Sequence, residues 1–411
     1  MEHSEHHVSE NLLSTTSRHE TKSSNSVRAY SDPLIPDDLL VEIFSRVPAK
    51  SIARFRCVSK FLVSILDQAT ELFLTKSLTR PRLLFTVKAT NGKLLLFSSP
   101  QSHNPDDNSS LVATPYHTSF PEYIPRDLFS TVCGLVLLQG WKGKRPVICN
   151  PVTGQFLTLP KVSLKEKNLP KVKAKSNRTK IAGMYLGYDP IGKQFKVLCM
   201  TSSLDERPNT HLVLTLKSGK RVWRTIEHEF HFEENNRMSG EICIDGVLYV
   251  GGGFGDAFGD GLSSRMVCFD VRSEKFSFIN ADEDMKLVGA YVVGGLTLFN
   301  YKGKLGIHEN RYDNRLVMWI LEDAGYHKWS KHVFVLSHSH YDIVERSMFV
   351  GVTSGETVVS ASHHKPFYVV FFNLESKTFN RVYIQGLEEF NKHPYVTLHT
   401  FVDYVENIKS M

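Results

Sequence analysis

The periodicity of the apolar residues changes once along the chain, near Pro81. Before this point, in Leu39–Val47 and Val58–Leu66, apolar residues recur every three or four positions, as on one side of a helix. After it, short apolar and β-branched runs alternate with polar turns, and Asn91–Gly92 is a strong hairpin signal. The sequence therefore predicts a multidomain chain, with a small all-α unit followed by a large all-β domain.

The helical unit is predicted over residues 34–80. Pro36 suits the first turn of a helix, and Pro48 ends that helix. Leu39 and Ile43 are expected to face the interior of the small bundle. The other apolar residues of this helix need a further surface: Leu34, Pro36, Leu40, Phe44 and Val47. So small a unit cannot cover them all, which favours an interaction site. Packing against the chain's own β-domain is the alternative.

One sequence unit recurs through the β-domain, which is predicted over residues 81–385. It consists of a strand, a polar turn, and a second strand with an early aromatic residue. The positions taken as equivalent are Asn150, Thr215, Asp270, Ile320 and Asn373. Repeats of roughly 50 residues fit the four-stranded blades of a β-propeller, six or seven in number. A pair of β-sandwiches is the alternative.

The composition disfavours several classes of protein. A net charge of +6 on 411 residues is modest for a nucleic-acid binder. The six cysteines are scattered without a CxxC pair, which is typical of buried thiols in a reducing compartment. No secretory signal starts the chain and no apolar stretch is long enough for a membrane span, so we expect the cytoplasm and/or the nucleus.

Three further segments are set apart by their composition. Residues 1–33 are rich in Ser, His and Thr, and they are predicted to be a disordered tail. Lys161–Lys180 is strongly basic and is predicted to be an exposed loop, with a nuclear-localisation signal as the alternative. Residues 386–411 are assigned to a C-terminal segment that follows the β-domain.

Sequence motifs for catalysis are weak. The glycine-rich run GGGFGDAFGDG at 251–261 lacks the order of a phosphate-binding loop. His338, His340 and Asp342, and the pair His363–His364, are interpreted as solvated residues of polar loops, because no third well-spaced metal ligand accompanies them. No catalytic residue, cofactor or metal ion is therefore predicted.

The segment Leu34–Leu66, LIPDDLLVEIFSRVPAKSIARFRCVSKFLVSIL, resembles the F-box motif. The matching parts are Leu34-x-Pro36, Glu42–Ile43, Arg46-x-Pro48-x-Lys50–Ser51 and Arg54–Lys60. Asn150–Gly154 (NPVTG) and Tyr188–Asp189–Pro190 are similar to recurring elements of the F-box-associated domain of plant proteins, a propeller-like domain. The paired glycines 251–252 and 294–295 resemble those of kelch repeats. Leu62 stands where the family usually has Trp, which leaves open whether adaptor binding is weaker.

This resemblance implies a function and a set of partners. F-box proteins bind an SKP-type adaptor and, through it, a cullin scaffold. The implied role is the substrate-recognition subunit of an SCF-type ubiquitin ligase, without catalytic activity of its own. The residues that the resemblance places at the adaptor are Leu34, Pro36, Leu39, Leu40, Ile43, Phe44, Val47, Pro48, Ile52, Phe55, Cys57, Val58, Ser59 and Lys60.

Two other functions stay open. One is an adaptor-bound scaffold that does not promote ubiquitination, and the other is a propeller lectin or enzyme. The protein substrate cannot be identified from the sequence. Nothing selects among Trp141, Trp223, Tyr301 and Tyr326 as its contacts.

Overall fold

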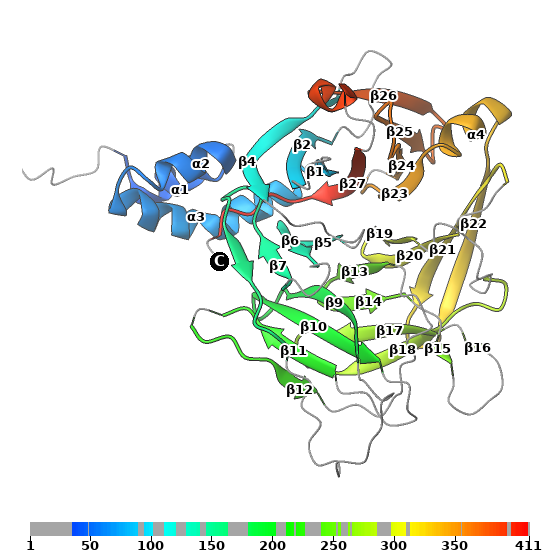
Figure 1. Ribbon diagram of the computed structural model, residues 1–411, viewed down its shortest axis with the longest axis horizontal. Helices are drawn as coiled ribbons and strands as arrows, with labels where there is room; N and C mark the ends of the chain where they lie inside the picture. The colour runs from blue at the N-terminus through cyan, green and yellow to red at the C-terminus, as the bar shows by residue number, and fades with distance from the viewer. Residues whose placement is uncertain are drawn as a thin grey trace, which may run out of the picture.

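The fold is known from a computed structural model that describes most of the chain between Ile35 and Lys409 (Figure 1). The described residues are 35–47, 49–88, 94–101, 111–120, 129–139, 145–162, 180–202, 211–217, 219–226, 240–251, 254–255, 262–263, 265–285, 297–309, 313–354, 356–392 and 396–409. Several sequence predictions fall outside these residues. They concern the tail 1–33, Leu34, Pro48, Asn91–Gly92, Trp141, most of Lys161–Lys180 and most of the glycine-rich run.

Three helices form the predicted helical unit: α1 (Asp37–Phe44), α2 (Ala49–Phe55) and α3 (Lys60–Leu78). Asp37 and Asp38 lie in the first turn of α1, where a negative charge stabilises the helix. Ser59 caps α3, since its hydroxyl accepts a hydrogen bond from the Leu62 N–H at 3.1 Å. In Figure 1 the three helices lie together at one side of the β-domain.

The β-domain is a six-bladed β-propeller, because the described strands form six four-stranded antiparallel units arranged in a ring (Figure 1). Blade 1 comprises β27 (Thr397–Tyr404), β1 (Arg82–Lys88), β2 (Leu94–Pro100) and β4 (Thr114–Phe120). Blade 2 comprises β5 (Phe129–Val132), β6 (Leu135–Leu138), β7 (Val147–Cys149) and β8 (Phe156–Thr158). Blade 3 comprises β9 (Lys180–Asp189), β10 (Gln194–Ser202), β11 (His211–Thr215) and β12 (Arg224–Ile226).

Blade 4 comprises β13 (Glu241–Ile244), β14 (Val247–Val250), β17 (Arg265–Asp270) and β18 (Phe276–Asn280). Blade 5 comprises β19 (Thr297–Tyr301), β20 (Lys304–Glu309), β21 (Arg315–Asp323) and β22 (Lys328–Val335). Blade 6 comprises β23 (Met348–Val352), β24 (Thr357–Ala361), β25 (Tyr368–Asn373) and β26 (Phe379–Gln385). The predicted propeller is confirmed, and the β-sandwich alternative is not observed.

The ring closes through strands from opposite ends of the chain. β27 pairs antiparallel with β1, and in this register Thr400 lies opposite Phe85. A second link is β3 (Leu111–Val112), which pairs parallel with the end of β26 in blade 6. The predicted domain end at residue 385 is therefore wrong, because the segment that follows supplies β27 to blade 1.

The turns between the third and fourth strands of the blades account for the sequence repeat. At equivalent places Asn150, Asp270 and Asn373 accept hydrogen bonds from backbone N–H groups two or three residues ahead. In blade 5 the residue with this role is Asp323, which accepts from the Tyr326 N–H at 3.0 Å. The predicted equivalence of Ile320 is wrong, because Ile320 lies inside β21 opposite Gly306.

His338 and His340, expected in a polar loop, lie on a short helix instead, whereas His363 and His364 lie outside the helices and strands. This helix, α4 (His338–Val344), joins blades 5 and 6. Its cap is Ser337, whose hydroxyl accepts a hydrogen bond from the His340 N–H at 3.2 Å. The imidazole ring of His340 stacks on Phe379, with ring centroids 4.1 Å apart. Near the C-terminus the chain forms a short 3-10 helix, η1 (Glu388–Lys392).

The blades pack through apolar side chains, and blade 5 has little room for a larger one. A Cβ atom at Gly306 would lie 2.4 Å from ring atoms of Phe299, which is itself only 2% exposed. We predict that Gly306→Ala lowers the free energy of unfolding by about 1–3 kcal/mol, since the buried ring has no free space to move into.

Urea unfolding followed by circular dichroism measures this effect. The matched control is Gly325→Ala in the turn between β21 and β22, where the nearest atom to a new Cβ is an Asp323 carboxylate oxygen at 3.3 Å. Equal stability of the two variants would contradict this account of the packing in blade 5.

Candidate functional site

Helix α1 carries an apolar stripe that the described part of the chain leaves exposed. Leu39 is 51% exposed and Ile43 is 48% exposed, and Ile35, just before the helix, is 42% exposed. Leu39 and Ile43 are four positions apart, so they share one side of α1. Val58 and Phe61, near the start of α3, are also exposed. Exposed apolar side chains gathered on one small unit indicate a protein-binding surface.

The direction in which α1 faces differs from the prediction. Leu39 and Ile43 were expected to be inside, but they are the exposed residues. Phe44, expected to need an outside partner, is 7% exposed, and its ring centroid lies 5.3 Å from that of Phe55. Leu40 and Val47 are partly buried against the same cluster. Apolar residues cover so much of this helix that their spacing alone could not determine which side packs inward.

The other residues predicted to contact an adaptor divide into three groups. Pro36, Cys57, Val58, Ser59 and Lys60 are exposed. Ile52 is completely buried, and Phe55 is partly buried, so together with Phe44 these residues support the surface from inside. Leu34 and Pro48 lie outside the described residues. Leu62 is partly buried against the helical core, and its effect on adaptor binding stays a prediction.

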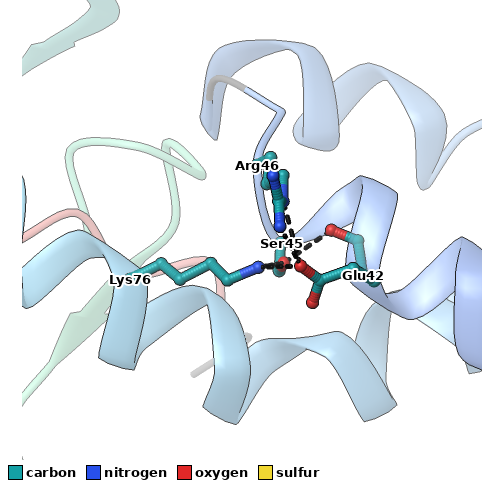
Figure 2. A network of polar contacts seen from close by, with 4 residues as sticks. All are labelled: Glu42, Ser45, Arg46 and Lys76. Atoms are coloured by element: carbon teal, nitrogen blue, oxygen red, sulfur yellow. Dashed lines mark hydrogen bonds and ion pairs between the residues drawn. The ribbon is translucent and has the colours of Figure 1, made fainter.

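A polar network fixes α1 against α3 (Figure 2). The Lys76 ammonium of α3 donates hydrogen bonds to Glu42 Oε1 at 2.6 Å and to Ser45 Oγ at 2.8 Å. Arg46 Nε donates to the same Glu42 oxygen at 2.9 Å. The hydrogen bond from Lys76, and after it that from Arg46, lowers the pKa of Glu42 from its usual 4.5. The Glu42–Ile43 pair of the sequence motif thus supplies one inward anchor and one exposed apolar side chain.

The helical unit is joined to the propeller by the last described residues, Val405–Lys409, which we call the C-terminal tail. Ile408 is 1% exposed and packs in the helical core together with Val152. The Glu406 N–H donates to Ser77 Oγ of α3 at 2.9 Å, and the Glu406 carboxylate accepts from the Tyr116 hydroxyl at 2.9 Å. The tail therefore lies between α3 and the propeller, as Figure 1 also shows.

Asn150, the first residue of the NPVTG segment, holds this tail in place. It is fully buried, and its Nδ2 donates to the Asn407 carbonyl at 2.9 Å and to the Lys409 carbonyl at 3.3 Å. Asn407 Nδ2 in turn donates to the Cys133 carbonyl at 2.8 Å. Gly134, with φ +82°, lets the tail approach, because a Cβ there would lie 2.5 Å from Asn407 Cβ.

Two charged contacts complete the attachment. Arg56 Nη2 donates to the Ile408 carbonyl at 3.2 Å and lies 2.9 Å from an Asp67 carboxylate oxygen. Lys193, in the β9–β10 turn, forms an ion pair with Glu71 of α3 at 2.9 Å. The helical unit thus packs on its own propeller through one side, as the alternative interpretation expected. The side that carries Leu39 and Ile43 remains exposed.

The described residues include no group of three or more His, Cys, Asp or Glu side chains placed to hold a metal ion. Burial raises the pKa of the Cys199 thiol to about 12, which is unsuited to a nucleophile. No described helix combines the length and the apolar character needed to cross a membrane.

Two family models match this arrangement. Residues 33–70 match the F-box domain, and residues 82–405 match the F-box associated beta propeller domain. The fold and the matched helical unit define a class of proteins that join an F-box to a propeller. This chain belongs to the family of F-box proteins with an F-box associated β-propeller domain.

Proteins of Arabidopsis thaliana are similar over nearly the whole chain. At1g53370 is 45% identical, over 95% of this chain and 96% of that protein. F-box protein At1g53790 is 44% identical, over 92% of this chain and 82% of that protein. F-box protein DOR is 40% identical, over 91% of this chain and 93% of that protein. The resemblance to plant F-box proteins is therefore confirmed.

We predict that Asn150→Ala loosens the C-terminal tail and with it α3. The variant loses two hydrogen bonds to the tail, each worth about 1 kcal/mol, so amide hydrogen exchange should accelerate in the tail and in Lys60–Leu78. Hydrogen–deuterium exchange with mass spectrometry measures this. Asn373→Ala is the matched control, because Asn373 caps the corresponding turn of blade 6. Equal exchange in α3 of both variants would overturn this role of Asn150.

The Glu42 network predicts a pH-dependent stability. Because the folded-state pKa of Glu42 is lowered, its contribution is complete above its ordinary value of 4.5 and is lost as the pH falls through the lowered value. We expect Glu42→Gln to lower the Tm near neutral pH, and this difference from the unaltered protein to shrink as the pH falls below 4.5. Thermal unfolding of both proteins across this range tests it. A difference that stays constant with pH would count against the network.

Proposed function

We propose that this chain is the substrate-recognition subunit of an SCF-type ubiquitin ligase. Membership of the F-box family with a propeller domain supports this role in general. The observation that carries the proposal is the exposure of Leu39 and Ile43 on α1, inside the segment that matches the F-box domain. The partner at this surface is an SKP-type adaptor, and the cullin scaffold follows through it.

Burying the exposed apolar side chains of the helical unit contributes a favourable free energy to adaptor binding. Fully burying one aliphatic side chain contributes about 1.5–3 kcal/mol, and these side chains are half buried already, so each adds about 1 kcal/mol on binding. Ile35, Leu39, Ile43, Val58 and Phe61 together provide enough apolar surface for the centre of an interface. Lys60 and the two aspartates that begin α1 provide polar groups around it.

The propeller holds the substrate in this proposal, and catalysis follows from proximity. A receptor that binds both the substrate and the ligase scaffold raises the local concentration of substrate lysines near the conjugating enzyme. No side chain of this chain needs to react. The attachment through the C-terminal tail serves this role, because it restricts how far the propeller can turn relative to the helical unit. The protein acts in the cytoplasm and/or the nucleus, where adaptor and scaffold are available.

We predict that Leu39→Glu combined with Ile43→Glu abolishes co-purification with an SKP-type adaptor. The charged side chains would have to lose their hydration at the interface, which costs several kcal/mol. Both positions are half exposed, so the fold should persist. The matched control is Val222→Glu combined with Val335→Glu, which places the same two charges at 59% and 70% exposed positions on the propeller. Adaptor recovery is measured after affinity purification, with circular dichroism as the check on folding.

Full recovery of the adaptor by the folded double variant would refute the proposed surface. Recovery of cullin and the conjugation of ubiquitin distinguish a ligase receptor from an adaptor-bound scaffold. If the unaltered protein recovers adaptor and cullin and supports ubiquitination of co-purifying proteins, it acts as a ligase receptor. Recovery of adaptor without cullin would favour the scaffold that does not promote ubiquitination.

A further inference from the structure

A pocket of about 320 Å³ lies between blades 5 and 6. It is lined by Tyr301, Met318, Ile320, His332, Phe334, Glu356, Leu374 and Glu375. Blade 5 contributes strands β19, β21 and β22, while blade 6 contributes the β23–β24 and β25–β26 turns. A cavity of this size is at the lower end for ligand sites, so it suits one long side chain rather than a large cofactor.

The helical unit does not cover this pocket. Its contacts are with Tyr116 of blade 1, Val152 of blade 2 and Lys193 of blade 3. In Figure 1 blades 5 and 6 lie on the other side of the ring from α1, α2 and α3. An adaptor on α1 and an occupant of this pocket therefore use different parts of the molecule.

The pocket has an apolar floor and aromatic walls. Met318, Ile320 and Leu374 are 1%, 2% and 8% exposed and belong to the cluster that packs blade 5 on blade 6. Tyr301 and Phe334 are partly buried against the same cluster. A flexible hydrocarbon stem can lie on such a floor while its polar end reaches the rim.

The carboxylates of Glu356 and Glu375 supply hydrogen-bond acceptors at the rim, and the imidazole of His332, whose Nε2 lies 3.2 Å from Ser330 Oγ, also lines the pocket. Glu356 Oε1 accepts from the Tyr301 hydroxyl at 2.8 Å and from Lys302 Nζ at 2.6 Å. Among the described residues, no hydrogen bond or ion pair reaches Glu356 Oε2 or the exposed carboxylate of Glu375. The hydrogen bond from Lys302 keeps the pKa of Glu356 below its usual range, so this carboxylate is charged at neutral pH. A donor with positive charge complements this rim.

The chain's own lysines show that cations suit the aromatic walls. Lys377 Nζ lies 4.4 Å from the centre of the Phe334 ring, and Lys302 Nζ lies 5.7 Å from that of Tyr301. Both distances are in the range of cation–π attraction. The guanidinium of arginine is weakly hydrated, stacks on rings and binds carboxylates through several donors, so it fits this combination better than an ammonium group does.

We propose that this pocket binds an arginine side chain of a partner protein. The methylene stem lies on Met318, Ile320 and Leu374, and the guanidinium donates to Glu356 Oε2 and to the Glu375 carboxylate. The binding itself stands without the ligase role. Only the identification of the partner as a ubiquitination substrate rests on the proposed function.

The first test uses small probes on the full-length protein. Nα-acetyl-arginine amide is compared with Nα-acetyl-citrulline amide, which has nearly the same shape but no charge, by ligand-observed NMR titration. We expect saturable binding of the arginine probe and about tenfold weaker binding of the citrulline probe, because the charge-assisted hydrogen bonds are lost. No saturable binding of the arginine probe, or equal binding of both, would overturn the proposal.

Three variants assign the binding to the pocket. Glu356→Gln with Glu375→Gln keeps the shape of the rim and removes its charge, so the arginine probe should bind about tenfold more weakly. Glu322→Gln is the matched control, because Glu322 pairs with Lys304 and does not line the pocket. Lys302→Met should strengthen binding, since it removes the cation that shares Glu356. A double variant that binds like the control, or a Lys302→Met protein that binds no better than the unaltered protein, would contradict the assignment.

Adaptor recovery distinguishes this proposal from the proposed function. The double variant Glu356→Gln with Glu375→Gln should recover as much SKP-type adaptor as the unaltered protein. Arginine binding without adaptor recovery by the unaltered protein would leave the pocket in place and refute the ligase role. Adaptor recovery without arginine binding would refute the arginine pocket and leave the ligase role in place.

Discussion

The pairing of β27 with β1 is the interaction on which the rest of the structure depends. It joins strands from opposite ends of the chain within blade 1, and it thereby closes the ring. The same segment then continues as the C-terminal tail, which packs Ile408 into the core of the helical unit. One continuous stretch of chain therefore closes the propeller and attaches the F-box helices to it.

This arrangement explains why NPVTG belongs to the recognisable part of the sequence. The comparable turns of blades 4, 5 and 6 also carry a residue that caps its own backbone, namely Asp270, Asp323 and Asn373. Asn150 has a second task, because its amide nitrogen is free to donate to the tail carbonyls while its oxygen caps the turn. An aspartate would cap the turn equally well but has no hydrogen to donate. Asn150 thus combines the cap of its own turn with attachment of the helical unit.

The sequence predicts those features that depend on neighbouring residues. The helices follow from local apolar spacing, and the blades follow from turns that repeat at similar intervals. The closure of the ring cannot be predicted in this way, since Phe85 and Thr400 are paired across strands that no short window of sequence contains. The direction of α1 was missed for a related reason. Which side of this apolar helix packs inward depends on Val152 and Ile408, which reach it from distant parts of the chain. The pocket likewise combines Tyr301 and Glu356 from different blades.

The exposed stripe and the buried side of α1 both follow from the small interior of the helical unit. A unit of three short helices has too little interior to enclose every apolar residue of α1. The C-terminal tail covers part of this surface, because Ile408 packs into the helical core and its carbonyl accepts a hydrogen bond from Arg56 Nη2. Leu39 and Ile43 point away from that contact and gain nothing from it. Covering them as well would require another segment of chain, and the exposed pair leaves on α1 an apolar surface of the kind that favours protein binding.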